Sequence, residues 1–583
     1  MQYIQVVPKL KISLKEDFFT YKIPANLLSE IKIGQLVEIG FAGRTIKGIV
    51  YKIIRRASSK IDKTRIKNIN RILYPEPIIS KDTFTLANMI SSNYLVSFSK
   101  ALFSLVEMPI LRKTKVKKQN INIKIPSSVF KKISELSKII SKISKAKKSA
   151  LIILPEINLA KMYFKELSKK IQSKNIYLFH HELSKSQKWQ IYQSALKGEN
   201  IIVIGTQTAS FLPISNLKLA IIEYCDLEGF KSDQAPKTDC RDYLIMLKKY
   251  KYFKLVFRGA GLPVRFFLEY KNKSFTFLSD DLKCKTFLLE KDYKNIFSDP
   301  LLAHINQSLK NKQKVFILIN QKGYAKSLYC TDCENILECE KCKKPLSLIA
   351  QDTTYCINCN LKTKMPTACP VCRGTRLTAI SYGISYYENV LANRFPKYNI
   401  KTIYKDHKNN NLENADIIIG TLKFFSVYFD PIGTSVYLNP ENYVFQSDFK
   451  AREKTNLIIS RLRTQSKKLI LYFDAKFREQ ITEIVNNRHF ILSELKERKK
   501  YLFPPYAKTI KIKNRFKTEN IAIEKIKELK SNLKRYYPDI SDPIPLSPYH
   551  NTKGYGYSII INSNQRYHPK LENLKGWQIE VDL

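Results

Sequence analysis

Glycine is scarce in this chain of 583 residues, and its distribution along the sequence is uneven. Only 17 glycines are present, and none lies between Gly48 and Gly198. A loop that wraps nucleotide phosphates with its backbone N–H groups needs glycines, because side chains would block the close approach of the phosphates. The sequence therefore excludes a glycine-rich phosphate-binding loop from this long segment.

Acidic residues and long apolar runs are also few. Asp and Glu number 51 against 100 Lys and Arg, which gives a formal net charge of +49. This excess favours a polyanionic partner, because each phosphate that is neutralised releases a condensed counterion. No run of about 18 apolar residues is present, so we expect no membrane-spanning helix. The first residues lack the pattern of a signal peptide, and we expect a cytoplasmic protein with reduced thiols.

Cysteine, in contrast, is concentrated. Eight of the 11 cysteines fall within 43 residues as four C-x-x-C pairs, which are Cys330 and Cys333, Cys339 and Cys342, Cys356 and Cys359, and Cys369 and Cys372. Each pair can point both sulfurs at one site, so two pairs can enclose a Zn²⁺ ion in a tetrahedral cage. Four pairs therefore predict two zinc ions per chain.

The spacing leaves two wirings open. In the nested wiring one ion is held by the outer pairs, Cys330, Cys333, Cys369 and Cys372, and the other by the inner pairs, Cys339, Cys342, Cys356 and Cys359. In the sequential wiring neighbouring pairs share an ion. Neither site contains a histidine or an open ligand position, so we expect structural zinc rather than metal catalysis. The other cysteines, Cys225, Cys240 and Cys284, have no partner at metal spacing and are expected to be buried.

The hydrophobic pattern predicts a multidomain α/β protein. Short segments bounded by Gly and Pro read as strands near the N-terminus, at 19–24, 35–41 and 47–54, and a helix is expected over about 81–103. Further along, apolar runs of strand length alternate with helical stretches, which predicts two parallel sheets covered on both faces. These runs lie at 151–154, 201–204 and 219–222, and again at 314–319, 417–419 and 469–472. A helix from Ser127 or Ser128 is expected to bury Phe130, Ile133, Leu136, Ile140 and Ile143.

Several short motifs then point to a family. The segment Gly323–Cys333 leads into the cysteine block, which ends in Ala-Cys-Pro-Val-Cys372, and two Gly-Thr motifs follow apolar strands at 202–207 and 418–421. Further matches are 151–158, 445–449 and Phe-Pro-Pro-Tyr at 503–506. Together they resemble primosomal protein N′, the PriA-type family of replication restart helicases, over nearly the whole chain.

The resemblance favours the nested zinc wiring and also implies a domain plan. This plan consists of a β-rich N-terminal domain that binds DNA 3′ ends, two RecA-like α/β lobes with an inserted double Cys₄ zinc domain, and an α+β C-terminal domain. The expected bounds are 1–108 for the first domain, 109–126 for a basic linker that is too short for the family's winged helix, 127–296 for lobe 1, 297–329 with 373–485 for lobe 2, 330–372 for the zinc insertion, and 486–583 for the last domain.

The resemblance also implies DNA-contacting residues in the N-terminal domain. They are Phe19, Tyr21, Gly43, Arg44 and Lys67. Thr20 stands where the family has an Asp that accepts a hydrogen bond from the 3′-hydroxyl, so we expect weaker recognition of a 3′ end.

Three helicase motifs depart from the family pattern. The place of the phosphate-binding loop, at 125–132, offers Lys131 or Lys132 but no glycine cradle. In the segment 223–226, which matches a D-E-x-H motif, Glu223 can replace the Asp, but Tyr224 stands where the family has the catalytic Glu.

The third departure lies in 461–468, the match to the arginine-finger motif, where the finger positions hold Gln465 and Lys468. The segment 258–263 also differs from the family's G-S-A-T-P. We therefore assign no catalytic residues and do not expect ATP as a cofactor.

The expected function is that of a PriA-type replication restart protein without helicase activity. It would bind branched or single-stranded DNA and promote primosome assembly with replisome proteins, as a monomer. Two alternatives stay open: an active ATP-dependent 3′→5′ DNA helicase with a cryptic nucleotide site, and a zinc scaffold that binds RNA or protein.

Overall fold

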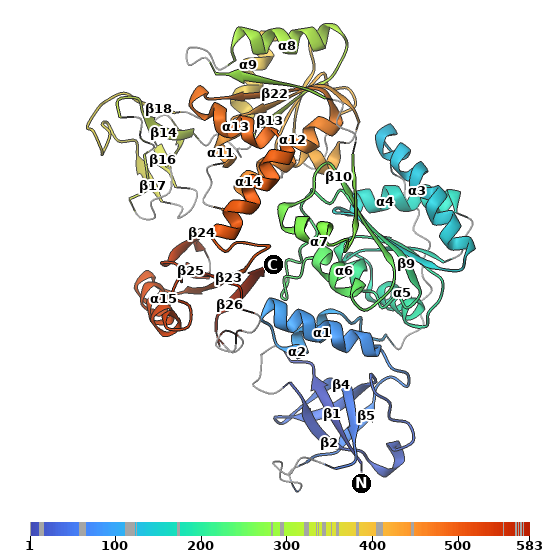
Figure 1. Ribbon diagram of the computed structural model, residues 1–583. Helices are drawn as coiled ribbons and strands as arrows, with labels where there is room; N and C mark the ends of the chain where they lie inside the picture. The colour runs from blue at the N-terminus through green and yellow to red at the C-terminus, as the bar shows by residue number, and fades with distance from the viewer. Residues whose placement is uncertain are drawn as a thin grey trace.

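The computed structural model shows five folded units, with one α/β lobe at the top, the other at the right, and the zinc-type module at the upper left (Figure 1). It describes residues 2–10, 17–56, 64, 66–110, 123, 125–171, 175–280, 284–291, 297–319, 326–333, 335, 337–340, 346–350, 353–356, 361–379, 384–403, 412–428, 430–444, 448–551, 553–565, 568, 571, 574 and 576–583. The predicted basic linker lies almost entirely outside these residues, and so do Cys342 and Cys359.

The N-terminal unit is an antiparallel sheet with the strand order β2-β1-β4-β3-β5. Its strands are β1 (Tyr3–Pro8), β2 (Phe19–Lys22), β3 (Leu36–Phe41), β4 (Arg44–Ile54) and β5 (Ile69–Ile72). The single predicted helix is in fact two, α1 (Lys81–Tyr94) and α2 (Phe98–Ser104). The break lies at Leu95, which takes a left-handed conformation with φ 53° and so ends α1.

Lobe 1 is built on a parallel sheet with the order β11-β10-β9-β6-β8-β7. The strands are β6 (Ser149–Ile153), β7 (Ile176–Phe179), β8 (Ile202–Gly205), β9 (Leu217–Glu223), β10 (Lys254–Gly259) and β11 (Thr276–Ser279). The helices are α3 (Ser127–Lys145), α4 (Ile157–Lys170), α5 (Lys185–Leu196), α6 (Cys240–Lys248) and α7 (Phe267–Lys271). On α3 the predicted apolar face is correct at Ile133, Leu136 and Ile140 but wrong at Phe130, which is 45% exposed.

Lobe 2 contains a second parallel sheet, with the order β12-β22-β21-β13-β20-β19. The strands are β12 (Lys285–Glu290), β13 (Val315–Ile319), β19 (Ile400–Ile403), β20 (Ile417–Gly420), β21 (Ile432–Leu438) and β22 (Ser466–Phe473). The helices are α8 (Asp299–Lys310), α9 (Ile384–Arg394), α10 (Phe424–Val427), α11 (Glu441–Val444), α12 (Ala451–Gln465), α13 (Arg478–Val485) and α14 (Asn487–Lys500).

Two predicted boundaries of lobe 2 shift. Strand β12 pairs in parallel with β22, so lobe 2 begins before the predicted boundary at 296. Helix α14 buries Phe490 and Leu495 in the core of lobe 2, so this helix belongs to the lobe and not to the C-terminal domain predicted from 486. The strand β12 was not predicted, and the packing partner of neither segment could be read from local sequence.

The last two units are smaller. The zinc-type module has the strand order β17-β16-β15-β14-β18, with β14 (Lys326–Cys330), β15 (Ser347–Ala350), β16 (Thr353–Tyr355), β17 (Lys362–Lys364) and β18 (Leu377–Ala379). The C-terminal domain pairs β24 (Ile544–Asn551), β25 (Gly554–Ser563), β23 (Lys508–Phe516) and β26 (Gln578–Asp582), and α15 (Glu519–Lys534) packs on this sheet.

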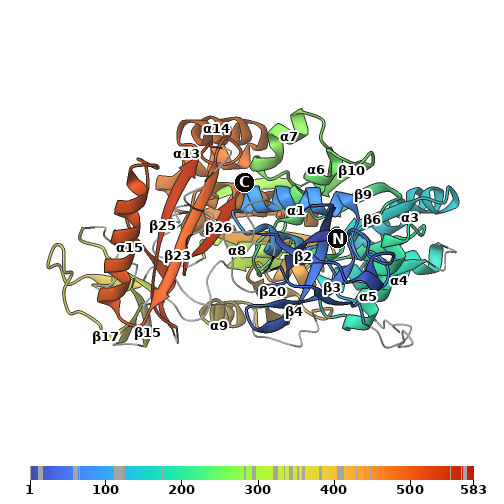
Figure 2. The same ribbon diagram turned by 90° about the horizontal axis from the view of Figure 1, so that it is seen from below.

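One continuous apolar core joins three of the units. Side chains of α1 and α2, of one face of lobe 1 and of the C-terminal sheet share the same buried cluster, which includes Ile90, Leu102, Tyr192, Leu244 and Ile512. Helix α1 lies next to lobe 1, beside α6 (Figure 2). The N-terminal unit is therefore packed against lobe 1 and the C-terminal domain and is not an independent domain on a linker. In the described part of the chain, no helix has the length and apolar character that crossing a bilayer requires.

Candidate functional sites

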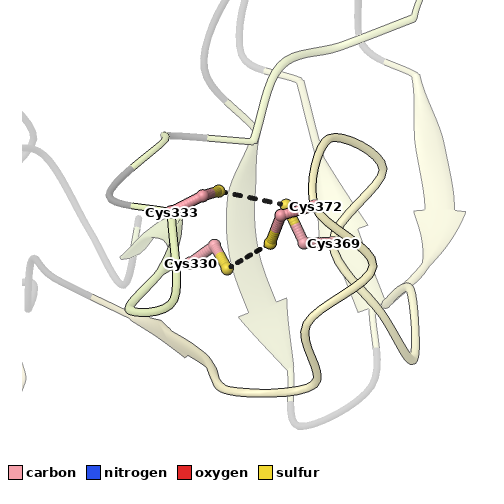
Figure 3. Close-up of side chains that lie close together, drawn as sticks. All are labelled: Cys330, Cys333, Cys369 and Cys372. Atoms are coloured by element: carbon pink, nitrogen blue, oxygen red, sulfur yellow. Dashed lines mark hydrogen bonds between the residues drawn. The ribbon is translucent and has the colours of Figure 1, made fainter.

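Four cysteines from the two ends of the zinc-type module converge on one point (Figure 3). The ligand atoms of Cys330, Cys333, Cys369 and Cys372 all lie within 4.8 Å of one another. The Sγ–Sγ distances are 3.6 Å for Cys330 and Cys372 and 3.7 Å for Cys333 and Cys369. A tetrahedron with metal–sulfur bonds of about 2.3 Å has edges of about 3.8 Å, so these four sulfurs fit a Zn²⁺ ion.

Backbone and side-chain N–H groups support these sulfurs. The N–H groups of Val371 and Gly374 point at the sulfurs of Cys369 and Cys372, each at 3.4 Å, and the Asn335 amide lies 3.6 Å from the Cys333 sulfur. N–H donors around a thiolate cage orient the ligands and offset their negative charge. The arrangement therefore has both the ligands and the surrounding donors of a structural metal site.

The converging set is the outer set of the nested wiring, so the sequential wiring is wrong for these four residues. Of the inner set, Cys339 and Cys356 are buried in one small cluster with Leu346. Their expected co-ligands, Cys342 and Cys359, lie outside the described residues. Among the described residues, the outer four cysteines form the one group of Cys, His, Asp and Glu gathered closely enough to hold a metal ion.

Residues of the three divergent motif segments, 125–132, 223–226 and 461–468, form ion pairs that join the two lobes. From lobe 1, Lys132 on α3 pairs with Asp280 at the end of β11, with 2.7 Å between Nζ and Oδ2. From lobe 2, Arg461 on α12 forms a two-pronged pair with Asp226 and also lies 3.5 Å from Asp280. The Arg461 side chain is 4% exposed and that of Asp226 is fully buried.

Tyr224 lies between the two cations of this cluster. Its ring has the Lys132 ammonium at 4.5 Å and the Arg461 guanidinium at 5.0 Å. Burial raises the pKa of the Tyr224 hydroxyl, so this side chain stays neutral at any physiological pH. A neutral phenol at this position cannot act as the carboxylate that orients an attacking water in phosphoryl transfer.

Glu223, the sequence candidate for a magnesium ligand, is fully buried at the end of β9. The Tyr163 hydroxyl donates to its Oε2 at 3.3 Å, and the nearest Arg258 nitrogen lies 3.7 Å from Oε1. Burial raises the pKa of this carboxyl, although Arg258 and Lys132 oppose the shift. A carboxyl enclosed in this way, facing a phenol and an arginine, is poorly placed to hold a hydrated Mg²⁺.

The residues predicted at the arginine-finger positions do not face lobe 1. The Gln465 amide donates to the Tyr428 carbonyl at 3.1 Å, and Lys468 contacts Gln307 at 2.7 Å, so both stay within lobe 2. Arg461, at the start of the same segment, instead contacts Asp226 and Asp280 of lobe 1. Sequence reasoning missed Arg461 and its partner Asp226 because an ion pair between residues 235 positions apart leaves no local signal.

A large cleft of about 1570 Å³ lies between the two lobes and the C-terminal domain. Its lining includes lysines from all three units, namely Lys161, Lys231, Lys423, Lys450, Lys454 and Lys511, and also carboxylates from all three, among them Asp226, Glu453 and Asp582. Both Gly-Thr motif regions line it, at 206–207 and 422–426. On the lobe 1 side, the Thr206 hydroxyl and the side-chain amide oxygen of Gln207 are buried with no hydrogen-bond partner in the described structure.

The residues predicted to contact DNA in the N-terminal unit divide into two groups. Gly43, Arg44 and Lys67 are exposed, and a Cβ added at Gly43 would meet open space. Phe19 packs edge-on against Phe41, with 4.9 Å between ring centroids, beside this exposed turn.

Tyr21 is different, because it is 5% exposed and belongs to the core of the sheet. Its hydroxyl donates to the Gly40 carbonyl at 3.1 Å, and burial raises its pKa to about 12. Its position fits support of the β3–β4 turn better than stacking on a base. DNA contact by these five residues remains a prediction.

The two parallel-sheet lobes and the cysteine module define a multidomain α/β protein with two RecA-like lobes, and comparisons narrow the class of protein. Residues 5–107 match the family model of the PriA 3'DNA-binding domain (3'BD). The Replication restart protein PriA of Borreliella burgdorferi is 26% identical over 423 residues, which cover 66% of this chain and 63% of that relative. The protein of the same name from Rickettsia conorii is 24% identical over 633 residues, which cover 96% of this chain and 94% of that relative. The chain is thus a divergent relative of the PriA-type replication restart proteins, which confirms the resemblance seen in its motifs.

A solved structure adds little to this assignment. The DNA-bound DUF1998 helicase MrfA aligns with 62% of this chain and 48% of its own, at 10% identity and a TM-score of 0.36. The alignment with the Borreliella protein spans less than two thirds of that relative's length. The activity of a whole PriA protein is therefore not transferred to this chain by similarity alone.

Proposed function

We propose that this chain is a replication restart protein of the PriA type that binds branched or single-stranded DNA, promotes primosome assembly and does not hydrolyse ATP. The loss of ATP hydrolysis is supported by the side chains that occupy the region expected to hold the triphosphate. Tyr224 replaces a catalytic carboxylate there, and the carboxylates of Asp226 and Asp280 already neutralise the cations Arg461 and Lys132. A triphosphate would have to displace both carboxylates to gain these cations.

Three features support DNA as the ligand. The net charge of +49 favours a polyanion. The cleft spans both lobes and is lined by lysines of each, beside carboxylates that pair with several of them. The N-terminal unit matches a domain whose family is named for binding 3′ DNA. A single strand that follows the cleft would meet lysines from each lobe.

In this function the zinc-type module, with strands β14 to β18, provides a rigid surface for binding partner proteins. We assign one Zn²⁺ to the four converging sulfurs and a second to the inner set that includes Cys339 and Cys356. The ions would supply the folding energy that so short a module cannot obtain from an apolar core. The exposed surface around the outer site, where Val371 is 67% exposed, would be available to partner proteins of the primosome.

A titration with forked DNA that follows both binding and phosphate release tests this proposal. We expect tight, salt-dependent binding to a fork with a 3′ leading-strand end and no phosphate release above a protein-free blank. Release stimulated by the fork would instead support the active helicase. Equal affinity for fork, plain duplex and RNA would support the zinc scaffold.

A further inference from the structure

Three sets of contacts join the two lobes, two of them directly and one through the C-terminal domain. From them we propose that the lobes are locked in a closed arrangement without any nucleotide, by protein side chains that occupy the place of a bound triphosphate. We call Lys132, Asp226, Asp280 and Arg461, together with the ring of Tyr224, the interlobe lock. This inference concerns the motion of the lobes, and only its DNA arm rests on the proposed function.

The charges of the interlobe lock balance within the protein. Two cations, Lys132 and Arg461, face two carboxylates, Asp226 and Asp280, and the exposed fractions of the four side chains are 18%, 4%, 0% and 7% in that order. The Ala260 backbone N–H also donates to Asp226, at 2.9 Å. Opening the lobes would return these charges to water, so the pairs hold the lobes weakly by themselves. Their main effect is to fix the relative orientation of α12 and lobe 1 through the planar geometry of the arginine pair.

Apolar packing supplies the attraction that the ion pairs lack. The loop after β10 inserts Val264 into the core of lobe 2, where this residue is 1% exposed. The Val264 N–H donates to Glu453 of α12 at 2.7 Å, and Arg498 of α14 holds the other oxygen of that carboxylate at 2.8 Å. A side chain of lobe 1 that is part of the lobe 2 core cannot leave without exposing apolar surface on both sides.

The C-terminal strand adds a third connection. Asp582 at the end of β26 pairs with Lys231 of lobe 1 at 2.7 Å and with Lys450 of lobe 2 at 3.0 Å. One carboxylate from a third unit therefore bridges the lobes on the cleft side. In a nucleotide-driven helicase, differential contact with the triphosphate moves the lobes. Here the contacts that close the lobes are all internal, so the cleft keeps one width whether or not ATP is present.

A disulfide across the interface tests the closed state without disturbing the lock. A Cβ placed on Gly261 of lobe 1 would lie 3.6 Å from the Cβ of Ser460 on α12. This separation falls within the range of about 3.5–4.5 Å that disulfides require. We expect the double variant Gly261→Cys, Ser460→Cys to cross-link under mild oxidation in the absence of nucleotide and DNA. The rate should be unchanged by a non-hydrolysable ATP analogue with Mg²⁺. Peptide mapping must separate this bond from one to the native Cys225, whose sulfur lies 3.6 Å from the Gly261 carbonyl oxygen.

A second pair of variants tests the lock itself. In the double-cysteine background, Arg461→Gln should slow cross-linking at least about tenfold, because it leaves two buried carboxylates under-neutralised at the interface. The matched control is Arg478→Gln, which removes an exposed arginine pair with Glu290 inside lobe 2 and should leave the rate unchanged. Far-ultraviolet circular dichroism confirms that each variant is folded.

The outcomes separate this inference from the proposed function. Cross-linking that requires nucleotide or DNA, or a rate that Arg461→Gln leaves unchanged, would overturn the lock. These measurements need no DNA, so a protein that failed to bind forks could still show it. The DNA arm compares forked-DNA affinity before and after cross-linking: equal dissociation constants support a constitutively closed cleft, and a large loss on cross-linking would mean that the lobes must open.

Discussion

The cysteine module and the interlobe region are two polar sites with opposite designs. In the module, four sulfurs face one another at the spacing of a metal's ligands. In the interlobe region, two carboxylates and two cations of the protein neutralise one another around a buried phenol. The first arrangement needs a ligand for its stability and the second does not. The presence of charged or polar groups at a motif position therefore says little about ligand binding until their pairing is known.

The strongest way to test this contrast is to damage the metal site. Cys369→Ser removes one of four converging sulfurs, and structural zinc sites of this type contribute apparent binding energies of about 10–16 kcal/mol. We expect metal content to fall from two ions per chain to one and the module to become sensitive to proteases.

The matched control is Cys284→Ser, which alters a partly buried cysteine outside the module. It should keep both ions. Two ions retained in Cys369→Ser would show that this residue is not a ligand, and fewer than two in the unmodified protein would refute the assignment of the inner site.

The interlobe region should respond less strongly. Arg461→Gln leaves Asp226 buried without its partner, and breaking a buried pair in this way costs about 3–5 kcal/mol. Urea unfolding of the lobes should show this loss, whereas the exposed pair removed by Arg478→Gln is worth about 0–1 kcal/mol. Equal effects of the two variants would mean that the buried pair contributes no more than a surface contact.

Acid should weaken the same region by a smaller amount. Burial acts to raise the pKa of Asp280, but Lys132 and Arg461 outweigh it and hold this pKa below the usual value of 3.8. The pairing therefore stabilises the fold above that value and is lost as the pH falls through the lower pKa of the folded state. Thermal unfolding of the protein and of Asp280→Asn should differ at about pH 6, and this difference should shrink as the pH falls below the usual Asp pKa of about 3.9. A difference that grows toward acid would have the wrong sign.

The smallest expected effect lies on α3, where sequence and structure disagree. Phe130→Ala should cost at most about 1 kcal/mol, because this ring is 45% exposed and contacts a lysine ammonium on its face. Ile133→Ala, one turn away and fully buried, should cost about 2–5 kcal/mol. Comparable losses would mean that Phe130 is covered in solution.

The sequence predicted those elements whose signal is local. The apolar runs at 151–154, 201–204 and 219–222 became β6, β8 and β9, because a strand buried on both faces must be apolar throughout. The C-x-x-C rhythm likewise located four ligands that the fold brings together. The break at Leu95 was missed, because a leucine in the left-handed conformation has no compositional signal.

Features that depend on distant partners could not be predicted. The pairing of β12 with β22, the docking of α14 into lobe 2 and the contact of Arg461 with Asp226 all join segments far apart in the chain. The absence of a glycine cradle was visible in the sequence, but what replaced the triphosphate was not. Only the three-dimensional placement shows that the remaining cations are already neutralised by carboxylates of the protein.

The shared core of α1, α2, lobe 1 and the C-terminal sheet has a practical consequence for dissecting the protein. A fragment that ends near residue 108, although it matches a named domain, would carry side chains such as Ile90 and Leu102 into water on the face that normally packs on lobe 1. We expect such a fragment to form inclusion bodies when expressed alone. Replacing those contact leucines and isoleucines with polar residues should recover soluble material.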